Sequence, residues 1–174
     1  MAYDQSVDMQ SVHAPVPAQI VIRSQQGKPP SAQDRKPAKA QESQYKNIFG
    51  SNGQRIDIDR FAQKLRNITA MSSSQRCARS VRIALESAGA KFNGHPVAAA
   101  DWGSTLQKVG FERINLAFDR PQKGDIYIIK RTQKHVYGHI AAYTGSHWVS
   151  DYRQRGYAVY KDPNVRYEYY RPSK

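Results

Sequence analysis

The chain has 174 residues, which suits one globular domain with a core of its own but not two. Its 27 Lys and Arg outnumber 14 Asp and Glu, and the net charge of +13 is typical of proteins that meet a polyanion, such as nucleic acid, an anionic membrane surface or an anionic cell-wall polymer. The single cysteine excludes an intramolecular disulfide framework and a cysteine-rich zinc site. No apolar run of about 18 residues predicts a membrane span, and residues 1–20 lack the pattern of a secretory signal.

Residues 1–45 differ in composition from the rest of the chain, being rich in Pro, Gln, Ser and Ala. Such a segment cannot bury enough apolar area to offset its chain entropy. We therefore expect a disordered or partner-ordered tail over residues 1–45 and one domain over residues 46–174. A simple tether is the plain interpretation of the tail; contact with a secretion apparatus is the alternative.

Apolar residues at helical spacing predict helices over residues 57–69, 77–88 and 98–109. The serines at 72–74 are expected to supply the N-cap of the second helix, and Gly89 its C-cap. Beyond residue 124 the apolar period changes to two. Five short strands are predicted, over residues 125–130, 138–144, 147–152, 157–161 and 165–171. This order predicts an α+β fold in which N-terminal helices pack on a five-stranded, mainly antiparallel sheet.

Cys77, the lone cysteine, falls in the first turn of the second predicted helix. There the helix dipole and the unpaired backbone N–H groups favour the thiolate, and Arg76 and Arg79 add positive charge. His139 follows 62 residues later, near the start of a predicted strand. A cysteine and a histidine placed in this way outline a Cys–His hydrolase. The plain alternatives are a buried structural thiol and a strand histidine satisfied by its neighbours.

Five short blocks occur in an order that resembles a known family. They are Cys-Ala-Arg-Ser-Val-Arg at 77–82, Asp101-Trp102-Gly103 followed by Gly110-Phe111, Gln-Lys-Gly-Asp-Ile at 122–126, Tyr-Gly-His-Ile-Ala at 137–141, and Trp-Val-Ser-Asp at 148–151. Over about residues 70–172 the chain resembles the CHAP and NlpC-type peptidoglycan amidases and peptidases, a branch of the papain-like cysteine hydrolases. The resemblance implies a papain-like fold, Cys77 as nucleophile, His139 as general base, and a polar residue on the next strand that orients the histidine.

The third catalytic residue depends on the register of the strands that follow His139. A three-residue loop over 144–146 would set His139 opposite Asp151, whereas a two-residue Gly145-Ser146 turn would set it opposite Tyr152. Carboxylate chemistry favours Asp151, which would accept from the imidazole N–H and fix its tautomer. The predicted catalytic residues are therefore Cys77, His139 and Asp151. Gln154 is a weaker candidate for the same position.

The resemblance implies hydrolysis of amide bonds in peptidoglycan stem peptides, without a metal or other cofactor. The basic domain and the absence of a predicted signal peptide resemble antibacterial effectors of the type VI secretion class. Such effectors are made in the cytoplasm, act in the periplasm of a target bacterium, and are blocked by an immunity protein in the active-site cleft. The alternatives are a phage-type lysin and a basic wall- or nucleic-acid-binding module with an inert cysteine. Specific nucleic-acid binding is not expected, because many of the tyrosines occupy predicted strands and no recognition motif accompanies them.

Overall fold

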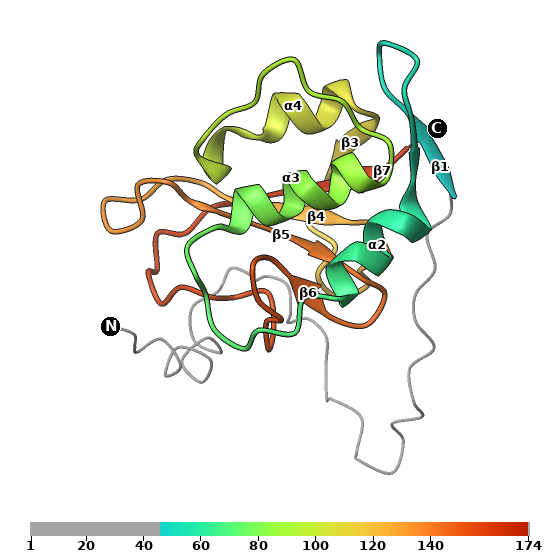
Figure 1. The fold of residues 1–174 in the computed structure, drawn as a ribbon. Helices are drawn as coiled ribbons and strands as arrows, with labels where there is room; N and C mark the ends of the chain where they lie inside the picture. Colours follow the sequence, from blue (N-terminus) through green and yellow to red (C-terminus); the bar gives the residue numbers. More distant parts are fainter. Residues whose placement is uncertain (1–45, 174) are drawn as a thin grey trace.

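The computed structural model describes residues 46–173; the predicted tail over residues 1–45 lies outside the described residues. A short hairpin comes first, the helices follow it, and the strands of the main sheet come last along the chain (Figure 1). In chain order the elements are β1 (Asn47–Phe49), β2 (Arg55–Asp57), α2 (Ile58–Arg66), α3 (Cys77–Ser87), the 3₁₀ turn η4 (Ala99–Asp101), α4 (Gly103–Lys108), β3 (Phe111–Ile114), β4 (Ile126–Ile129), β5 (His139–Tyr143), β6 (Trp148–Val149) and β7 (Tyr167–Pro172).

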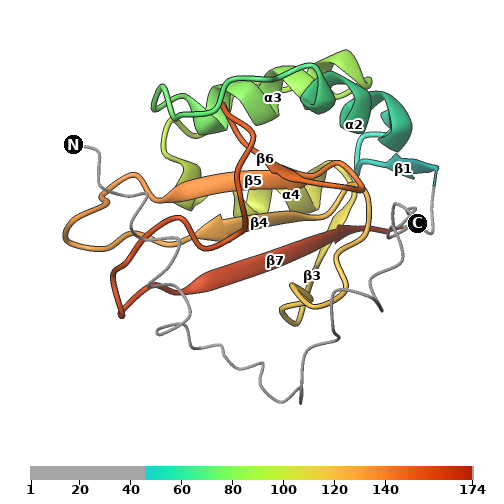
Figure 2. The ribbon, with the colours of Figure 1, turned by 90° about the horizontal axis from the view of Figure 1, so that it is seen from below.

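The architecture is α+β, as predicted. Five strands form one sheet in the order β3-β7-β4-β5-β6, and every neighbouring pair is antiparallel. Helices α2 and α3 lie together over one face of this sheet (Figure 2). Strands β1 and β2 form a separate two-stranded hairpin just before α2.

Both faces of the central strand β4 are buried, because its side chains alternate between two apolar clusters. Ile126 and Ile128 belong to the cluster beneath the helices, which also holds Phe61, Leu65 and Leu85. Tyr127 and Ile129 belong to a second cluster on the other face. That cluster is mainly aromatic and includes Trp148 and Tyr169, with Phe118, Tyr157 and Tyr167 packed against it. The sheet is therefore the middle layer of the domain.

The first two predicted helices form with small shifts at their ends, and the third is interrupted. The side chain of Asp57 caps α2 by accepting from the Arg60 N–H. Helix α3 ends near Gly89, whose φ of +120° suits glycine and where a Cβ would lie 2.3 Å from the Arg55 carbonyl oxygen. In the third segment, η4 and α4 are separated at the fully buried Trp102.

The strand predictions were wrong in three places. Residues 157–161 form no strand, and the fifth strand is instead Phe111–Ile114, which pairs with β7. The strand predicted over 147–152 is only Trp148–Val149. The hairpin of β1 and β2 was not predicted. Its strands are three residues each, too short to show a clear period.

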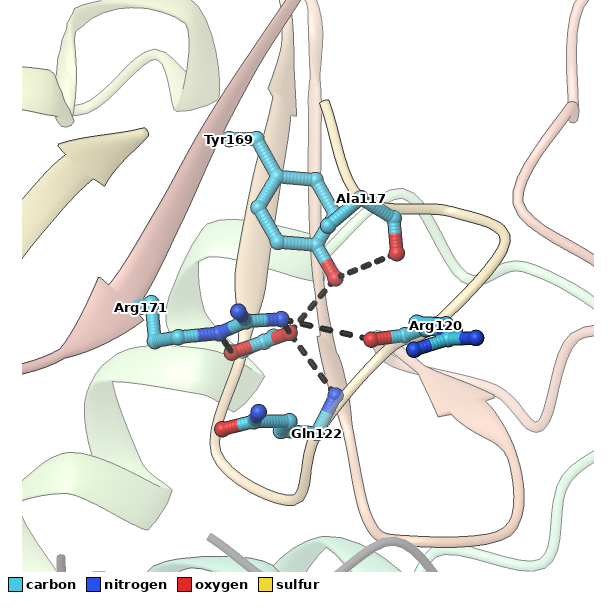
Figure 3. Close-up of polar contacts among 6 residues, drawn as sticks. Ala117, Arg120, Gln122, Tyr169 and Arg171 are labelled. Carbon is cyan, nitrogen blue, oxygen red and sulfur yellow. Dashed lines mark hydrogen bonds and ion pairs between the residues drawn. The ribbon is translucent and has the colours of Figure 1, made fainter. Parts of the chain in front are cut away.

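A buried ion pair ties the start of β4 to the end of β7 (Figure 3). Asp125 is fully buried, and its two carboxylate oxygens accept from the guanidinium of Arg171 at 3.0 and 2.8 Å. The same carboxylate accepts from the Tyr169 hydroxyl at 2.6 Å and from the Gln122 backbone N–H at 2.8 Å. The block at 122–126 therefore has a structural role, because its Asp125 fixes the turn that leads into the central strand.

Candidate active site

Cys77 and His139 come together because α3 packs on β5. Cys77 is the first residue of α3, is partly exposed, and packs against the core beneath the helices. His139 is the first residue of β5 and is 5% exposed. Gly138, directly before it, has a φ of +67°, and a Cβ there would lie 2.2 Å from the Ile129 carbonyl oxygen. Only glycine fits this close approach of β5 to β4 without displacing backbone.

The thiol and the imidazole form a hydrogen-bonded pair, and each changes the pKa of the other. Burial raises the pKa of the Cys77 thiol, but the hydrogen bond and charge of His139 and the backbone N–H of Ile140 bring this pKa below its ordinary value. Burial lowers the pKa of His139, but its hydrogen bond and charge interaction with Cys77 bring that pKa above its ordinary value. Both directions favour a thiolate–imidazolium pair.

Gln154 is the residue that contacts the imidazole from the other side. Its Oε1 lies 2.8 Å from Nε2 of His139, and both side chains are buried. The Gln154 amide nitrogen donates to the Tyr127 hydroxyl and to the Gly156 carbonyl, each at 2.9 Å. The Tyr127 hydroxyl in turn donates to the Tyr157 carbonyl at 2.7 Å.

This chain of hydrogen bonds fixes the tautomer of His139. Tyr127 donates its only proton to Tyr157, so its oxygen must accept from the Gln154 amide nitrogen. The Gln154 oxygen then faces the imidazole and accepts from Nε2–H. Since Nε2 carries this proton, Nδ1 is the ring nitrogen left for the Cys77 sulfur.

Asp151 does not meet the imidazole in the way the sequence suggested. Its Oδ2 accepts from the Ser73 and Ser74 hydroxyls at 3.2 and 2.9 Å, and from the backbone N–H groups of Ser74 and Arg76. Burial raises the pKa of this carboxyl, but those backbone N–H groups hold it below its ordinary value. Asp151 therefore binds the loop before α3, and it influences the Cys77–His139 pair through its charge.

The preferred register was wrong, and the two-residue turn is the one that forms. The Thr144 N–H donates to the His147 carbonyl, and Ala142 pairs with Val149. Regular pairing would continue to Tyr152 opposite His139, but β6 ends at Val149. The chain then turns and bridges Val149 to Arg153. This reversal brings Gln154 against His139, so the weaker of the two sequence candidates, and not Asp151, contacts the imidazole.

A cleft of about 580 Å³ opens at His139. On one wall the His135 ring stacks on the Tyr160 ring, with ring centroids 3.5 Å apart. The Tyr160 ring also contacts the His139 ring edge-on. The rim carries Lys134, His135 and Lys161 against a single acidic residue, Asp162. Hydroxyl-bearing Ser73 and Tyr152 complete the polar lining. The cleft is therefore open, aromatic on one side and mainly basic at its edge.

Within residues 46–173, no group of three or more His, Cys, Asp or Glu side chains could hold a metal ion. Over the same residues, no helix combines the length and the apolar character needed to cross a bilayer.

Solved structures resemble this chain, whereas no family model and no curated protein matches it. One is the crystal structure of the native type VI effector–immunity complex Tae3–Tai3 from Ralstonia pickettii, with 32% identity, a TM-score of 0.57, and coverage of 66% of this chain and 98% of that chain. The selenomethionine form of the same complex gives 32% identity, a TM-score of 0.56, and coverage of 64% and 99%. The CHAP and NlpC resemblance stays a prediction. At this identity and this coverage of the solved relative, the chain belongs to the Tae3 family of type VI effectors.

Proposed function

We propose that this protein is a cysteine amidase that hydrolyses amide bonds in peptidoglycan stem peptides and acts as an antibacterial type VI effector. The observation that carries the proposal is the hydrogen-bonded series Cys77–His139–Gln154, whose histidine lines an open cleft. A nucleophile, a base and a group that orients the base are the three parts that thiolate hydrolysis of an amide requires. The papain-like and CHAP/NlpC assignment belongs to this proposal and rests on the sequence blocks.

In the proposed reaction, the Cys77 thiolate attacks the amide carbonyl carbon while His139 is protonated. The carbonyl oxygen becomes an oxyanion, which accepts hydrogen bonds from backbone N–H groups at the start of α3. No side chain caps this end of the helix, so the first N–H groups are open to a ligand. The imidazolium then protonates the leaving amine, the C–N bond breaks, and an acyl thioester forms on Cys77.

Hydrolysis of the thioester restores the enzyme. Neutral His139 takes a proton from water, and the resulting hydroxide attacks the thioester carbonyl. The C–S bond breaks, a carboxylate product leaves, and Cys77 again shares a proton with His139. Gln154 keeps the ring in one orientation through both half-reactions, because its own amide is held by Tyr127 and Gly156.

The charge of the cleft supports an anionic substrate. Lys134 and Lys161 stand at its rim with Asp162 as the only carboxylate in the lining. Peptidoglycan stem peptides are rich in free carboxylates, so a basic rim attracts and orients them. The +13 net charge of the chain acts in the same direction toward the anionic wall.

Family membership supports the effector over a phage-type lysin. The solved relatives are effector–immunity complexes, and we propose that this chain likewise has an immunity protein, which closes the cleft. The proposed site of action is the periplasm of a target bacterium. We propose residues 1–45 as a separate tail, a tether or a contact with the secretion apparatus, and residues 46–174 as the catalytic domain.

The test is digestion of purified sacculi followed by mass spectrometry of the released muropeptides. The wild-type protein should release new amine and carboxylate ends in equal amounts, and the bond identity follows from the fragment masses. Cys77→Ala is the matched control, and it should fold but release nothing. Equal product from the wild type and Cys77→Ala would refute the thiolate mechanism. Intact sacculi with a folded wild-type protein would refute the substrate and favour a binding module with an inert cysteine.

A further inference from the structure

The loop directly before Cys77 is held by one carboxylate. Asp151 is 7% exposed. Its Oδ2 accepts hydrogen bonds from the hydroxyls of Ser73 and Ser74 and from the backbone N–H groups of Ser74 and Arg76. Its other oxygen, Oδ1, accepts from the Ser150 hydroxyl at 3.2 Å. Asp151 comes from the segment that follows β6, so it joins two parts of the chain more than 70 residues apart.

The backbone of this loop adopts a conformation that needs such an anchor. Gln75 has a φ of +63° and is the only non-glycine residue with positive φ among residues 46–173. A left-handed conformation at a residue with a Cβ costs roughly 1–2 kcal/mol. It also turns the N–H groups on both sides of Gln75 toward one point, as in the backbone nests that bind anions. The Asp151 carboxylate occupies that point.

The position of the nucleophile depends on this loop. Arg76 is the N-cap residue of α3, and neither its side chain nor any serine caps the helix. The predicted serine cap was therefore wrong, because Ser73 and Ser74 donate to Asp151 instead. With the Arg76 N–H held by Asp151, the next residues along the chain begin the helix with their N–H groups unclaimed by any cap.

The charge of Asp151 has opposing effects on the catalytic pair. It raises the pKa of Cys77, which opposes the thiolate, and it raises the pKa of His139, which favours the imidazolium. The imidazole is oriented by Gln154 through a direct hydrogen bond. What remains for Asp151 is its capacity to accept several hydrogen bonds at once.

We propose that Asp151 is a positioning residue that fixes residues 73–76, so that the uncapped start of α3 presents its N–H groups to the oxyanion. The inference rests on the proposed amide hydrolysis, and it assigns Asp151 a role in stabilising the intermediate rather than in generating the thiolate. Two reactions of Cys77 separate these roles. Hydrolysis passes through an oxyanion, whereas alkylation by iodoacetamide needs only the thiolate.

The substitutions follow from the geometry. Asp151→Ala removes both carboxylate oxygens, and with them the hydrogen bonds of Ser73, Ser74 and Arg76 to residue 151. Asp151→Asn keeps an oxygen for the Ser74 and Arg76 N–H groups, and its new NH₂ can donate to the Ser150 hydroxyl, so it loses charge but not the anchor. Ser150→Ala is the matched control, since it removes a bond to Oδ1 and leaves the loop contacts at Oδ2 in place. Ser74→Ala removes one contact of the loop, the hydrogen bond from the Ser74 hydroxyl to Asp151. This variant tests the same role if Asp151→Ala does not fold.

The experiment measures kcat and KM on soluble muropeptides released from sacculi by a muramidase, and the iodoacetamide rate of the same full-length proteins. Thermal unfolding checks that each variant is folded. Asp151→Ala should lose about 100- to 1000-fold in kcat, the usual effect of removing an oxyanion donor, with KM nearly unchanged and alkylation slowed less than about 5-fold. Asp151→Asn should recover most of the kcat, Ser150→Ala should resemble the wild type, and Ser74→Ala should fall between Asp151→Ala and the wild type.

Four outcomes would overturn the inference. An Asp151→Asn variant as inactive as Asp151→Ala would show that the charge is required. A parallel loss of alkylation and kcat in Asp151→Ala would assign Asp151 to thiolate generation. Wild-type kcat in a folded Asp151→Ala, or in Ser74→Ala if Asp151→Ala fails to fold, would remove the anchoring role. An inactive wild-type protein would refute the proposed function and this inference with it. That outcome is distinguishable from the other three, because the wild-type activity is measured before any variant is compared with it.

Discussion

Gln154 and His139 are joined by a buried hydrogen bond of 2.8 Å between Oε1 and Nε2. The glutamine amide has no freedom to rotate, because its nitrogen donates to Tyr127 and to Gly156. A neutral amide at this position orients the imidazole without adding a negative charge beside the thiolate. The negative charge near the pair comes from Asp151, which is hydrogen-bonded to the loop before α3 and not to the imidazole.

Gln154→Ala should lower kcat by about 10-fold or more, because the ring loses the acceptor that fixes its tautomer. Forcing the wrong tautomer in a serine protease costs about 10⁴-fold, which sets the upper end of the expected loss. Steady-state hydrolysis of muropeptides measures the effect. Arg155→Ala, an exposed neighbour, is the control and should keep full activity. Full activity in Gln154→Ala would mean that the imidazole needs no partner on this side.

Tyr127→Phe should produce a smaller loss of kcat than Gln154→Ala, together with a small loss of stability. The phenyl ring still fills the aromatic cluster, but one buried Gln154 N–H loses its partner and the hydrogen bond from residue 127 to the Tyr157 carbonyl is lost. A buried polar group without a partner costs about 1–3 kcal/mol. Urea unfolding gives the stability change, and kinetics give the change in kcat. A variant with unchanged values of both would show that the network ends at Gln154.

The rate of alkylation of Cys77 should rise with pH through an inflection below the ordinary thiol value of about 8.5. His139→Ala should move this inflection upward. The reason is that the hydrogen bond and charge that lower the pKa are lost, while burial and the charge of Asp151 continue to raise it. Cys77→Ser, which leaves no thiol in the chain, gives the background rate. Identical inflections in the wild type and His139→Ala would show that the two groups are not coupled.

Asp125→Ala should destabilise the domain by about 3 kcal/mol, near the lower end for breaking a buried ion pair, because the Arg171 side chain keeps 24% exposure. The variant also leaves the Tyr169 hydroxyl without its carboxylate partner. Chemical unfolding measures the difference. Asp119→Ala, an exposed acid in the preceding loop, should change stability by less than about 0.5 kcal/mol. Equal effects of the two substitutions would contradict the structural role of the 122–126 block.

A protein reduced to residues 46–174 should hydrolyse muropeptides at the wild-type rate, since the hydrogen-bonded series and the cleft lie between residues 73 and 163. Killing in cell-to-cell competition should fall if the removed segment contacts the secretion apparatus, and should persist if it is only a tether. A folded but inactive truncated protein would mean that the domain boundary lies earlier than residue 46.

Local pattern was sufficient to predict the helices that carry and support Cys77, and the motif around His139 placed it on the neighbouring strand. The predicted register was wrong because it follows carboxylate chemistry, which favours Asp151, whereas turn chemistry favours a two-residue loop. Gly145-Ser146 has glycine first, the residue order of a tight two-residue hairpin, and Gly145 has a φ of +102°. Thr144 reinforces the turn by accepting from the His147 N–H through its hydroxyl.

Other features could not be predicted because they depend on contacts between distant residues. Strand β3 is four residues long and forms because β7 lies beside it, more than 50 residues later in the chain. The serines at 73 and 74 resemble a helix cap in sequence, but their hydroxyls donate hydrogen bonds to a buried carboxylate about 77 residues away. The sequence ranks Gln154 below Asp151, because Gln154 reaches His139 only after an irregular reversal for which the local sequence has no period.

Strand β6 ends after two residues, and this early end leaves a gap in the backbone ladder beside β5. The Ile140 N–H, which a longer strand would have used for pairing, instead stabilises the negative sulfur of Cys77. The early end of β6 therefore leaves a backbone N–H group available to stabilise the thiolate anion. Substitutions in residues 150–152 that favour continued pairing should make the sheet more stable and the thiol less reactive. At this edge, thermal robustness and reactivity are therefore opposing properties.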